Sequence, residues 1–427
     1  MRTCLIEDLQ KYSIGRVAFN WLFIYQSVSN LFYFRSINYG VVMQFHLDDY
    51  LKVIRPHLSP ALVSDESLSD IEMVAHMFPG MISSFFGFEC RLGDKNARAD
   101  FLLCAKPDEK GREILADQND QIKLPSFFFE QPAWNRIREF CVNWSDISSP
   151  LYENVKNVWL EFDLDKAPDK IPTPSFFFGS ETIRKSSLIS NDSQSNYYQH
   201  QWVIENALKI VRGGLVSPDI QSNLINCFNL LPSEAHVFQI GSMMSRNTDA
   251  VRICIRDIST DMMPKYLNDI GWEDSTSDLN RLLVKLDQYV DRVDLDLDIG
   301  ATILPKIGLE CYLDQDPNYE PRWQLFLDEL VTDGICIPEK RDSLLSYEGI
   351  SNDKSSTDLW PPYLLEMSRN LKSLAGSIIY RFINHIKIVY QPDFPLEAKA
   401  YLAVDHQQIT IVDVLKSLSI IQSKSNW

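Results

Sequence analysis

Acidic and apolar residues alternate between Val293 and Ile299, where the chain reads Val-Asp-Leu-Asp-Leu-Asp-Ile. Side chains of a β-strand point to opposite faces with a period of two, so this segment puts three aspartates on one face. Such a row could pair with cationic side chains or hold Mg²⁺ through oxygen ligands. Alternate strand positions lie about 7 Å apart, which is too far for all three aspartates to coordinate one ion. Asp294, Asp296 and Asp298 are therefore secondary metal candidates, and we expect no metal requirement.

Other strand-like segments alternate in the same way, with polar side chains opposite aliphatic ones. Their polar members are Arg252 and Arg256, His385 and Lys387, Lys399 and Tyr401, and Trp159, Glu161, Asp163 and Asp165. Any one such segment is also typical of the solvent face of an ordinary sheet. Their repetition along the chain favours a shared polar surface.

Five segments read as β-hairpins, each separated from the next by sequence that reads as helix. They pair Phe85–Arg91 with Arg98–Ala105, Val158–Asp165 with Ser175–Gly179, Val237–Met244 with Ala250–Asp257, Val293–Gly300 with Lys306–Leu313, and His385–Gln391 with Ala398–Val404. Helices are expected within 46–83, 135–142, 199–211, 218–231, 262–270, 278–289, 321–331, 338–345, 363–379 and 409–418, and polar loops at 186–196 and 351–357.

This alternation predicts an α+β fold, a ten-stranded antiparallel barrel closed on itself with the helices outside. If the apolar strand faces carry the helices, the charged faces line the interior. A lining this polar must contain water or a polar ligand, because unpaired buried charge is costly.

The composition is that of a globular protein. The chain has 427 residues, 45% of them hydrophobic and 23% charged, and no linker rich in proline or glycine divides it. We expect a single domain over 46–427. With 41 basic and 58 acidic residues, the net charge of −17 argues against nucleic acid or an anionic membrane as a partner. Eight scattered cysteines without a Cys-x-x-Cys pair indicate free thiols in a reducing cytoplasm.

The first 45 residues form an expected N-terminal extension outside the core. Val17 to Phe34 carries no charge, but polar residues such as Asn20 and Gln26 interrupt it, and a membrane span needs about 20 predominantly apolar residues. Glu7 and Asp8 argue against a secretory signal. A peripheral extension, a membrane anchor and a natural start at Met43 stay open.

A helix–strand–strand–helix unit repeated five times resembles the aromatic prenyltransferases of the αββα-barrel group, in particular their indole (dimethylallyltryptophan synthase-like) members. The layout covers most of residues 46–410. Local matches are Glu89 in Phe-Gly-Phe-Glu, Arg98 in Ala-Arg-Ala-Asp, and Phe162-Asp163-Leu164. The sixth strand departs from the family's Arg-x-Lys-x-Tyr, because it reads Arg-Ile-Cys-Ile-Arg from Arg252. The fourth strand lacks the family's Lys-x-Tyr, and Glu310 stands where a lysine usually precedes Tyr312.

The resemblance implies an alkyl transferase that moves a prenyl group from a prenyl diphosphate to an aromatic or peptide acceptor in specialised metabolism. Cationic and hydroxyl groups would stabilise the leaving diphosphate, aromatic walls would shield the carbocation, and a base would take the final proton. The implied base is Glu89, and Trp159 would line the acceptor pocket. The implied diphosphate ligands are Arg98, Arg252, Arg256, Lys387, Lys399, Tyr312 and Tyr401. No cofactor is required, Mg²⁺ is an optional addition, and the protein would be a monomer or weak dimer.

Two other functions stay open. One is a non-catalytic barrel that binds an amphiphilic small molecule or peptide, and the other is an enzyme that uses the aspartate row with a metal. The placement of the charged residues distinguishes a non-catalytic binding barrel from a transferase. A transferase should gather its cations at one depth of the barrel, whereas a binding protein should have each cation paired with an acid such as Glu161, Asp163, Asp296 or Glu310. The chain has no Gly-x-Ser-x-Gly, His-Glu-x-x-His, P-loop or Gly-x-Gly-x-x-Gly motif.

Overall fold

The structure is a computed structural model that describes residues 45–164, 171–184, 200–246, 248–273, 276–354, 359–370 and 376–409. The expectations for residues 1–44, for Asp165, for the loop at 186–196, for residues 355–357 of the loop at 351–357 and for the helix at 409–418 beyond residue 409 lie outside these residues. Within them, no helix combines the length and apolar character that crossing a bilayer requires.

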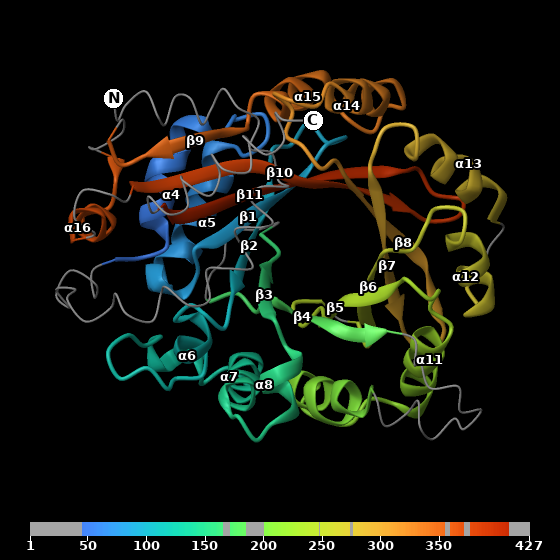
Figure 1. The fold of residues 1–427 in the computed structure, drawn as a ribbon, viewed down its shortest axis with the longest axis horizontal. Coiled ribbons are helices and arrows are strands. Elements are labelled where there is room, and N and C mark those ends of the chain that lie inside the picture. Colours follow the sequence, from blue (N-terminus) through green and yellow to red (C-terminus); the bar gives the residue numbers. More distant parts are fainter. Residues whose placement is uncertain are drawn as a thin grey trace, which may run out of the picture.

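Ten of the eleven strands in the described part of the chain form a closed antiparallel ring, as the sequence predicts (Figure 1). They are β1 (Phe85–Arg91), β2 (Ala99–Ala105), β3 (Asn157–Phe162), β4 (Ser175–Arg184), β5 (His236–Ser242), β6 (Val251–Arg256), β7 (Arg292–Ile299), β8 (Ile303–Tyr312), β10 (Gly376–Tyr390) and β11 (Glu397–Ile409). Each strand up to β8 pairs with the next, β8 pairs with β10, and β11 closes the ring by pairing with both β10 and β1.

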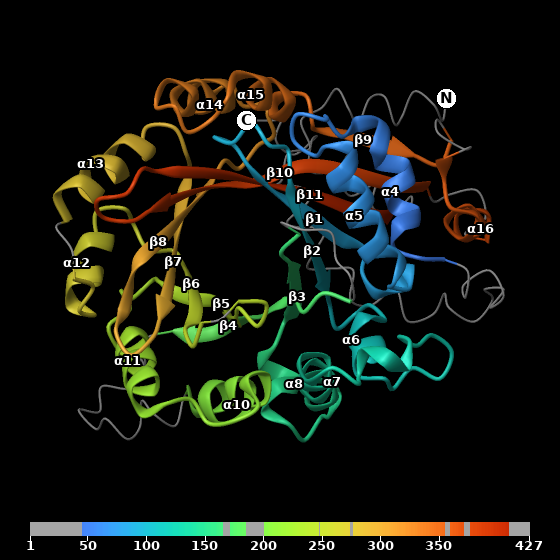
Figure 2. The ribbon, with the colours of Figure 1, turned by 180° about the vertical axis from the view of Figure 1, so that it is seen from behind.

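Helices surround the ring on its outside in both views (Figures 1 and 2). They are α4 (Asp48–Ile54), α5 (Asp65–His76), α6 (Gly111–Leu115), α7 (Pro132–Ser145), α8 (Pro150–Asn154), α10 (Lys209–Arg212), α11 (Pro218–Asn229), α12 (Met263–Asp269), α13 (Thr276–Leu286), α14 (Arg322–Thr332), α15 (Pro338–Leu345) and α16 (Pro362–Asn370), with a π-helix at Trp202–Leu208. Local sequence starts several of them. Ser64 caps α5 through the Ser67 amide, and Ser217 caps α11, which has proline at its first position.

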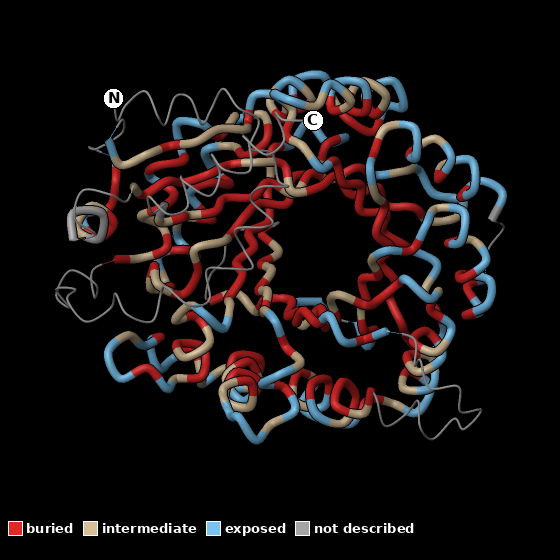
Figure 3. Tube along the Cα trace, in the orientation of Figure 1, coloured by how far each residue is buried: buried red, intermediate tan, exposed pale blue. Residues whose placement is uncertain are grey.

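The hydrophobic core lies between the outer face of the ring and the helices (Figure 3). Phe162 of β3 stacks on Trp134 of α7 with ring centroids 6.3 Å apart, and Phe176 of β4 meets Phe140 of α7 edge-on at 4.8 Å. The side chains that alternate with these core residues point the other way. The apolar strand faces therefore carry the helical coat, as expected from their alternation.

Three local features differ from the expectations. The helix expected over 363–379 ends at Asn370, and β10 begins at Gly376, because the following Ser-Ile-Ile-Tyr is rich in strand-forming residues. A short strand, β9 (Gly349–Asn352), pairs with the first part of β10. The first hairpin's second strand begins at Ala99, so Arg98 precedes it.

Replacement of Phe162 by alanine tests the outer core. Phe162 is fully buried, so Phe162→Ala is expected to lower the free energy of unfolding by about 3–5 kcal/mol, because it leaves a cavity against Trp134. Phe394→Ala, at a residue that is 63% exposed, is the matched control and should change it by less than about 0.5 kcal/mol. Urea unfolding of both variants measures the difference, and equal effects would contradict the assigned core.

Candidate functional site

The polar faces of the strands line the inside of the ring. Leu160 and Phe162 of β3 belong to the outer core, so Trp159 and Glu161 point inward, and the same parity turns the aspartates of β7 inward. Trp159, Glu161 and Tyr401 each remain partly exposed although they lie inside a closed ring. Solvent therefore reaches the barrel interior.

Lys387 of β10 occupies the most buried charged cluster of this lining. Its ammonium contacts the Asp296 carboxylate and lies 3.5 Å from Glu310 Oε1, and all three residues are at most 8% exposed. Gly308 leaves room for this side chain, since a Cβ there would stand 2.5 Å from Lys387 Cε. Burial lowers the pKa of Lys387, but Asp296 and Glu310 outweigh it and hold that pKa above its ordinary value. The ammonium therefore stays charged.

Arginines of β6 and β7 pair with the other two aspartates of the row. Arg252 binds Asp298 through two bonds, Nε to Oδ1 at 2.8 Å and a terminal nitrogen to Oδ2 at 2.9 Å. Arg256 Nε donates to Asp294 at 3.0 Å, and Arg292 Nε donates to the other oxygen of Asp294 at 2.9 Å. Burial raises the pKa of Asp294 to about 6 although both arginines oppose the shift.

Tyr312 lies beside these arginines. The Arg292 guanidinium sits 4.2 Å from the centre of its ring, and the Arg256 guanidinium 5.9 Å. Its hydroxyl donates to Glu310 Oε2 at 2.8 Å. The ring is therefore a cation-binding wall, while its hydroxyl is committed to an acid.

Glu89 of β1 lies directly opposite Tyr401 of β11 in the strand register. Lys399 Nζ donates to Glu89 Oε1 at 2.6 Å, and the Tyr401 hydroxyl donates to Oε2. Burial alone would raise the pKa of Glu89, but Lys399 and Tyr401 outweigh it and bring that pKa well below the ordinary value. His385 stacks on the Tyr401 ring with centroids 4.2 Å apart, which joins this group to the Glu310 cluster.

Glu161 of β3 is the exception among these inward carboxylates. It forms no hydrogen bond or ion pair with another described residue. Burial and the negative charge of Glu89 raise its pKa to about 8, against the opposing effect of Lys387 and Arg252. The interior thus contains two glutamates whose environments push their pKa values apart, an arrangement typical of acid–base sites.

An aromatic wall adjoins the charged lining. The rings of Phe85 and Trp159 meet edge-on at 5.4 Å, and Phe85 stacks on Phe382 at 6.3 Å. Phe382 in turn stacks on Tyr380 at 4.9 Å, and Phe177 lies opposite Trp159 in the register of β3 and β4. Only Trp159 is predicted from the sequence. In Ser-Phe-Phe-Phe, no alternation marks which phenylalanine points inward.

The predicted site residues come together with one exception. Glu89, Arg252, Arg256, Lys387, Lys399, Tyr312, Tyr401 and Trp159 all line the interior. Arg98 instead binds helix α5, through Asp70 at 2.5 Å and Glu66 at 2.9 Å. The expectation that Arg98 joins the other cations is wrong because its position, one residue before β2, lets the side chain turn toward α5.

Each of the four other predicted cations contacts at least one carboxylate. Two further arginines that the sequence does not single out follow the same rule, since Arg246 binds Asp163 at 2.7 Å and Arg91 binds Asp100 at 3.2 Å. The lining is therefore close to charge-balanced. Within the described residues, no three acidic, histidine or cysteine side chains gather as a metal site, and the aspartates of β7 each contact a cation instead.

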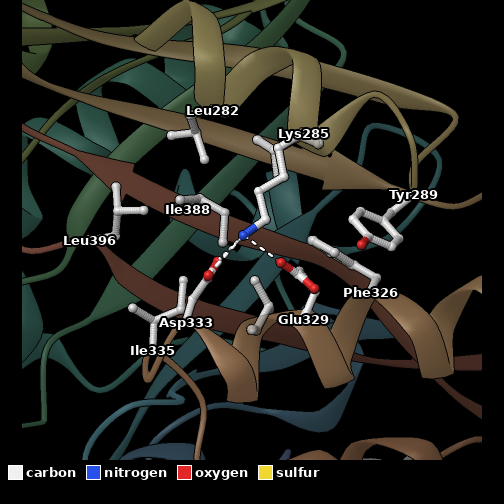
Figure 4. A pocket seen from close by; sticks show the side chains of 11 residues that line it. Leu282, Lys285, Tyr289, Phe326, Glu329, Asp333, Ile335, Ile388 and Leu396 are labelled. Carbon is white, nitrogen blue, oxygen red and sulfur yellow. Dashed lines mark hydrogen bonds and ion pairs between the residues drawn. The ribbon is translucent and has the colours of Figure 1, made fainter. Parts of the chain in front are cut away.

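A small pocket on the outer surface is separate from this interior (Figure 4). It lies between α13, α14 and β10, and Lys285 bridges Glu329 at 2.5 Å and Asp333 at 2.7 Å across it. Ile388, which belongs to the outer core, forms part of its floor. The pocket is a gap in the helical coat and holds none of the predicted site residues.

Comparisons with known proteins found similar solved structures only. No protein-family model and no curated protein matches the chain. Among solved structures, the chain is similar to the prenyltransferase PriB (TM-score 0.44, 11% identity, covering 87% of this chain and 96% of that one). It is also similar to AnaPT from Neosartorya fischeri (0.43, 12%, 86% and 97%) and to 5-dimethylallyltryptophan synthase from Streptomyces coelicolor (0.44, 12%, 84% and 97%). Likeness at this level supplies no site residues.

Replacement of Lys387 by methionine tests the buried cluster. Lys387→Met is expected to lower the free energy of unfolding by about 3–5 kcal/mol, because it leaves Asp296 and Glu310 buried without their cation. The exposed pair of Lys265 and Asp269 provides the control, and Lys265→Met should have almost no effect. Chemical denaturation of both variants gives the comparison; a loss in Lys387→Met no larger than in the control would refute the cluster.

The strand pairing by itself establishes the architecture: this chain has the αββα-barrel fold, ten antiparallel strands closed into a ring inside a coat of helices.

Proposed function

We propose that the protein transfers a prenyl group from a prenyl diphosphate to an aromatic or peptide acceptor inside the barrel. The observation that carries the proposal is the composition of the interior. An aromatic wall of Phe85, Trp159 and Phe382 adjoins cations, tyrosine hydroxyls and two glutamates within one closed ring. Prenyl transfer needs these four kinds of group in one enclosed space.

Each part of the lining has a role in this reaction. Arg252, Arg256, Lys387 and Lys399 would bind the diphosphate, and the charge that develops on its oxygens would be stabilised as the carbon–oxygen bond breaks. Tyr312 and the aromatic wall would face the carbocation, because aromatic rings attract cations and exclude water. The side-chain cations take the place of a metal ion, so the proposal requires no cofactor.

The carboxylates that already pair with these cations set a condition on diphosphate binding. A diphosphate must displace Asp298 or Asp294 from its arginine, or those carboxyl groups must be neutral. Burial raises the pKa of Asp294 to about 6 and also raises that of Asp296. Protonation of Asp294 would release Arg256 for the ligand, and protonation of Asp296 would leave Glu310 as the remaining acidic contact of Lys387. Diphosphate binding should therefore take up protons.

The pH dependence of binding follows from this condition. An aspartate with a raised pKa becomes neutral as the pH falls through about 6, which removes a competitor for the arginines. Dimethylallyl diphosphate is expected to bind about tenfold more weakly for each pH unit above 6 over which one proton is taken up on binding. Isothermal titration calorimetry in two buffers with different ionisation heats counts the protons.

Asp294→Asn is the variant for this test. It keeps the size of the side chain and removes its charge, so it should bind the diphosphate more tightly at pH 8 and show a weaker pH dependence. Asp287→Asn, outside the barrel after α13, is the control. Binding that tightens steadily with rising pH in the unmodified protein would contradict the proposed competition.

A second function is favoured by the same ion pairs. A non-catalytic barrel that binds an amphiphilic small molecule or peptide needs a balanced lining, and each inward cation named here has an acidic neighbour. Incubation with dimethylallyl and geranyl diphosphate and a set of indoles, tyrosine derivatives and peptides, followed by mass spectrometry, distinguishes the two. A product heavier by one prenyl group supports transfer. Absence of diphosphate binding at every chain length between pH 6 and 8 would exclude transfer and leave the binding function.

A further inference from the structure

The two inward glutamates differ in their freedom to exchange a proton. Both oxygens of Glu89 are engaged, one by Lys399 Nζ at 2.6 Å and the other by the Tyr401 hydroxyl. Both contacts favour the ionised carboxylate, and its protonation would leave the buried Lys399 ammonium beside a neutral group. Glu89 is therefore suited to holding Lys399 and Tyr401 in place.

Glu161 has the opposite surroundings. It projects inward from β3, opposite Leu102 of β2 and Ser175 of β4, and no described residue binds its carboxyl group. The side chain is partly exposed to the interior, two residues from the inward Trp159 of the aromatic wall. An acceptor held against Trp159 would therefore lie on the same face of β3 as the Glu161 carboxyl group.

Charged groups from several strands face Glu161 across the interior. They are Glu89 of β1, Arg252 of β6, Arg246 after β5 and Lys387 of β10, with Tyr401 of β11 also within electrostatic range. Burial and Glu89 raise the pKa of Glu161 to about 8, and the three cations limit the rise. A group that titrates near the working pH is an efficient proton acceptor, because it is basic enough to take a proton and ionised often enough to do so.

We infer that Glu161, rather than Glu89, takes the proton from the aromatic acceptor. The inference rests on the proposed prenyl transfer. In that step the carbon–oxygen bond of the prenyl diphosphate breaks, and diphosphate leaves with the electron pair. The acceptor ring forms the new bond to the prenyl carbon. The carbon–hydrogen bond at that ring position then breaks, its electron pair restores the aromatic ring, and the proton passes to a Glu161 carboxylate oxygen. Glu89 is a positioning residue for Lys399 and Tyr401.

The first test is the pH profile of turnover at saturating prenyl diphosphate. In the unmodified protein, kcat should rise about tenfold per pH unit below pH 8 and level off above it, because only ionised Glu161 accepts a proton. Glu161→Gln should lower kcat by about 10²- to 10⁴-fold and abolish that rise.

Glu161→Asp should keep the rise, with a lower kcat. Glu89→Gln should keep the rise but move it to lower pH, because the negative charge of Glu89 helps to raise the pKa of Glu161. Glu153→Gln, on the exposed surface of α8, is the control with unchanged activity.

A second measurement needs no turnover. A carboxyl group with a raised pKa binds more protons in the folded state than in the unfolded state, so it makes the fold less stable as the pH rises from about 4.5 to about 8. Glu161→Gln should therefore be stabilised relative to the unmodified protein at pH 8.5 by more than at pH 5. Urea unfolding at both values measures the difference, with Glu153→Gln again unchanged.

The outcomes separate this inference from the proposed function. A Glu161-dependent pH–rate rise together with the pH-dependent stability difference supports both. Turnover that keeps its pH dependence in Glu161→Gln, or a stability difference equal at both pH values, overturns the role of Glu161 and leaves prenyl transfer standing. If the unmodified protein binds and turns over no prenyl diphosphate, the proposed function fails, and the assigned proton transfer fails with it.

Discussion

The pairing of β11 with both β1 and β10 is the constraint on which the rest of the structure depends. Closing the ring leaves no free strand edge among the ten strands, and it commits one face of every strand to a shared interior. Because side chains alternate along a strand, a one-residue slip in this register would send Lys399 and Tyr401 to the helices and Ala400 and Leu402 to the interior. The hydrophobic core outside the ring holds the register, and the register assembles the interior.

Buried charge dominates the interior that results. Asp294, Asp296 and Asp298 each contact a cation from a neighbouring strand, and Glu89 contacts Lys399. Such pairs contribute little net stability, since desolvation offsets most of the attraction, but the loss of one partner is strongly destabilising. The network therefore fixes geometry more than it adds stability. It also means that any anionic ligand competes with carboxylates already in place, which ties ligand binding to protonation.

The two glutamates illustrate how environment assigns different roles to one residue type. Glu89 and Glu161 both face the same interior. Lys399 and Tyr401 keep Glu89 ionised, whereas burial and the negative charge of Glu89 raise the pKa of Glu161. Neither effect belongs to glutamate itself. The proposed division between a positioning residue and a proton acceptor follows from which partners each side chain has across the barrel.

The sequence by itself determined the hairpins, their alternation and hence the inward face, because a period of two is a local property of the strand. Lys387, Lys399 and Arg252 were predictable for this reason, whereas Glu89 was singled out by the resemblance to a known family. Only the tertiary structure decided which side chains pair. Arg98 turns to α5, Phe85 and Phe382 join Trp159, and Glu161 has no ionic partner among the described residues. These depend on contacts between strands far apart in the chain, and local patterning carries no information about such distances or about the electrostatic field they create.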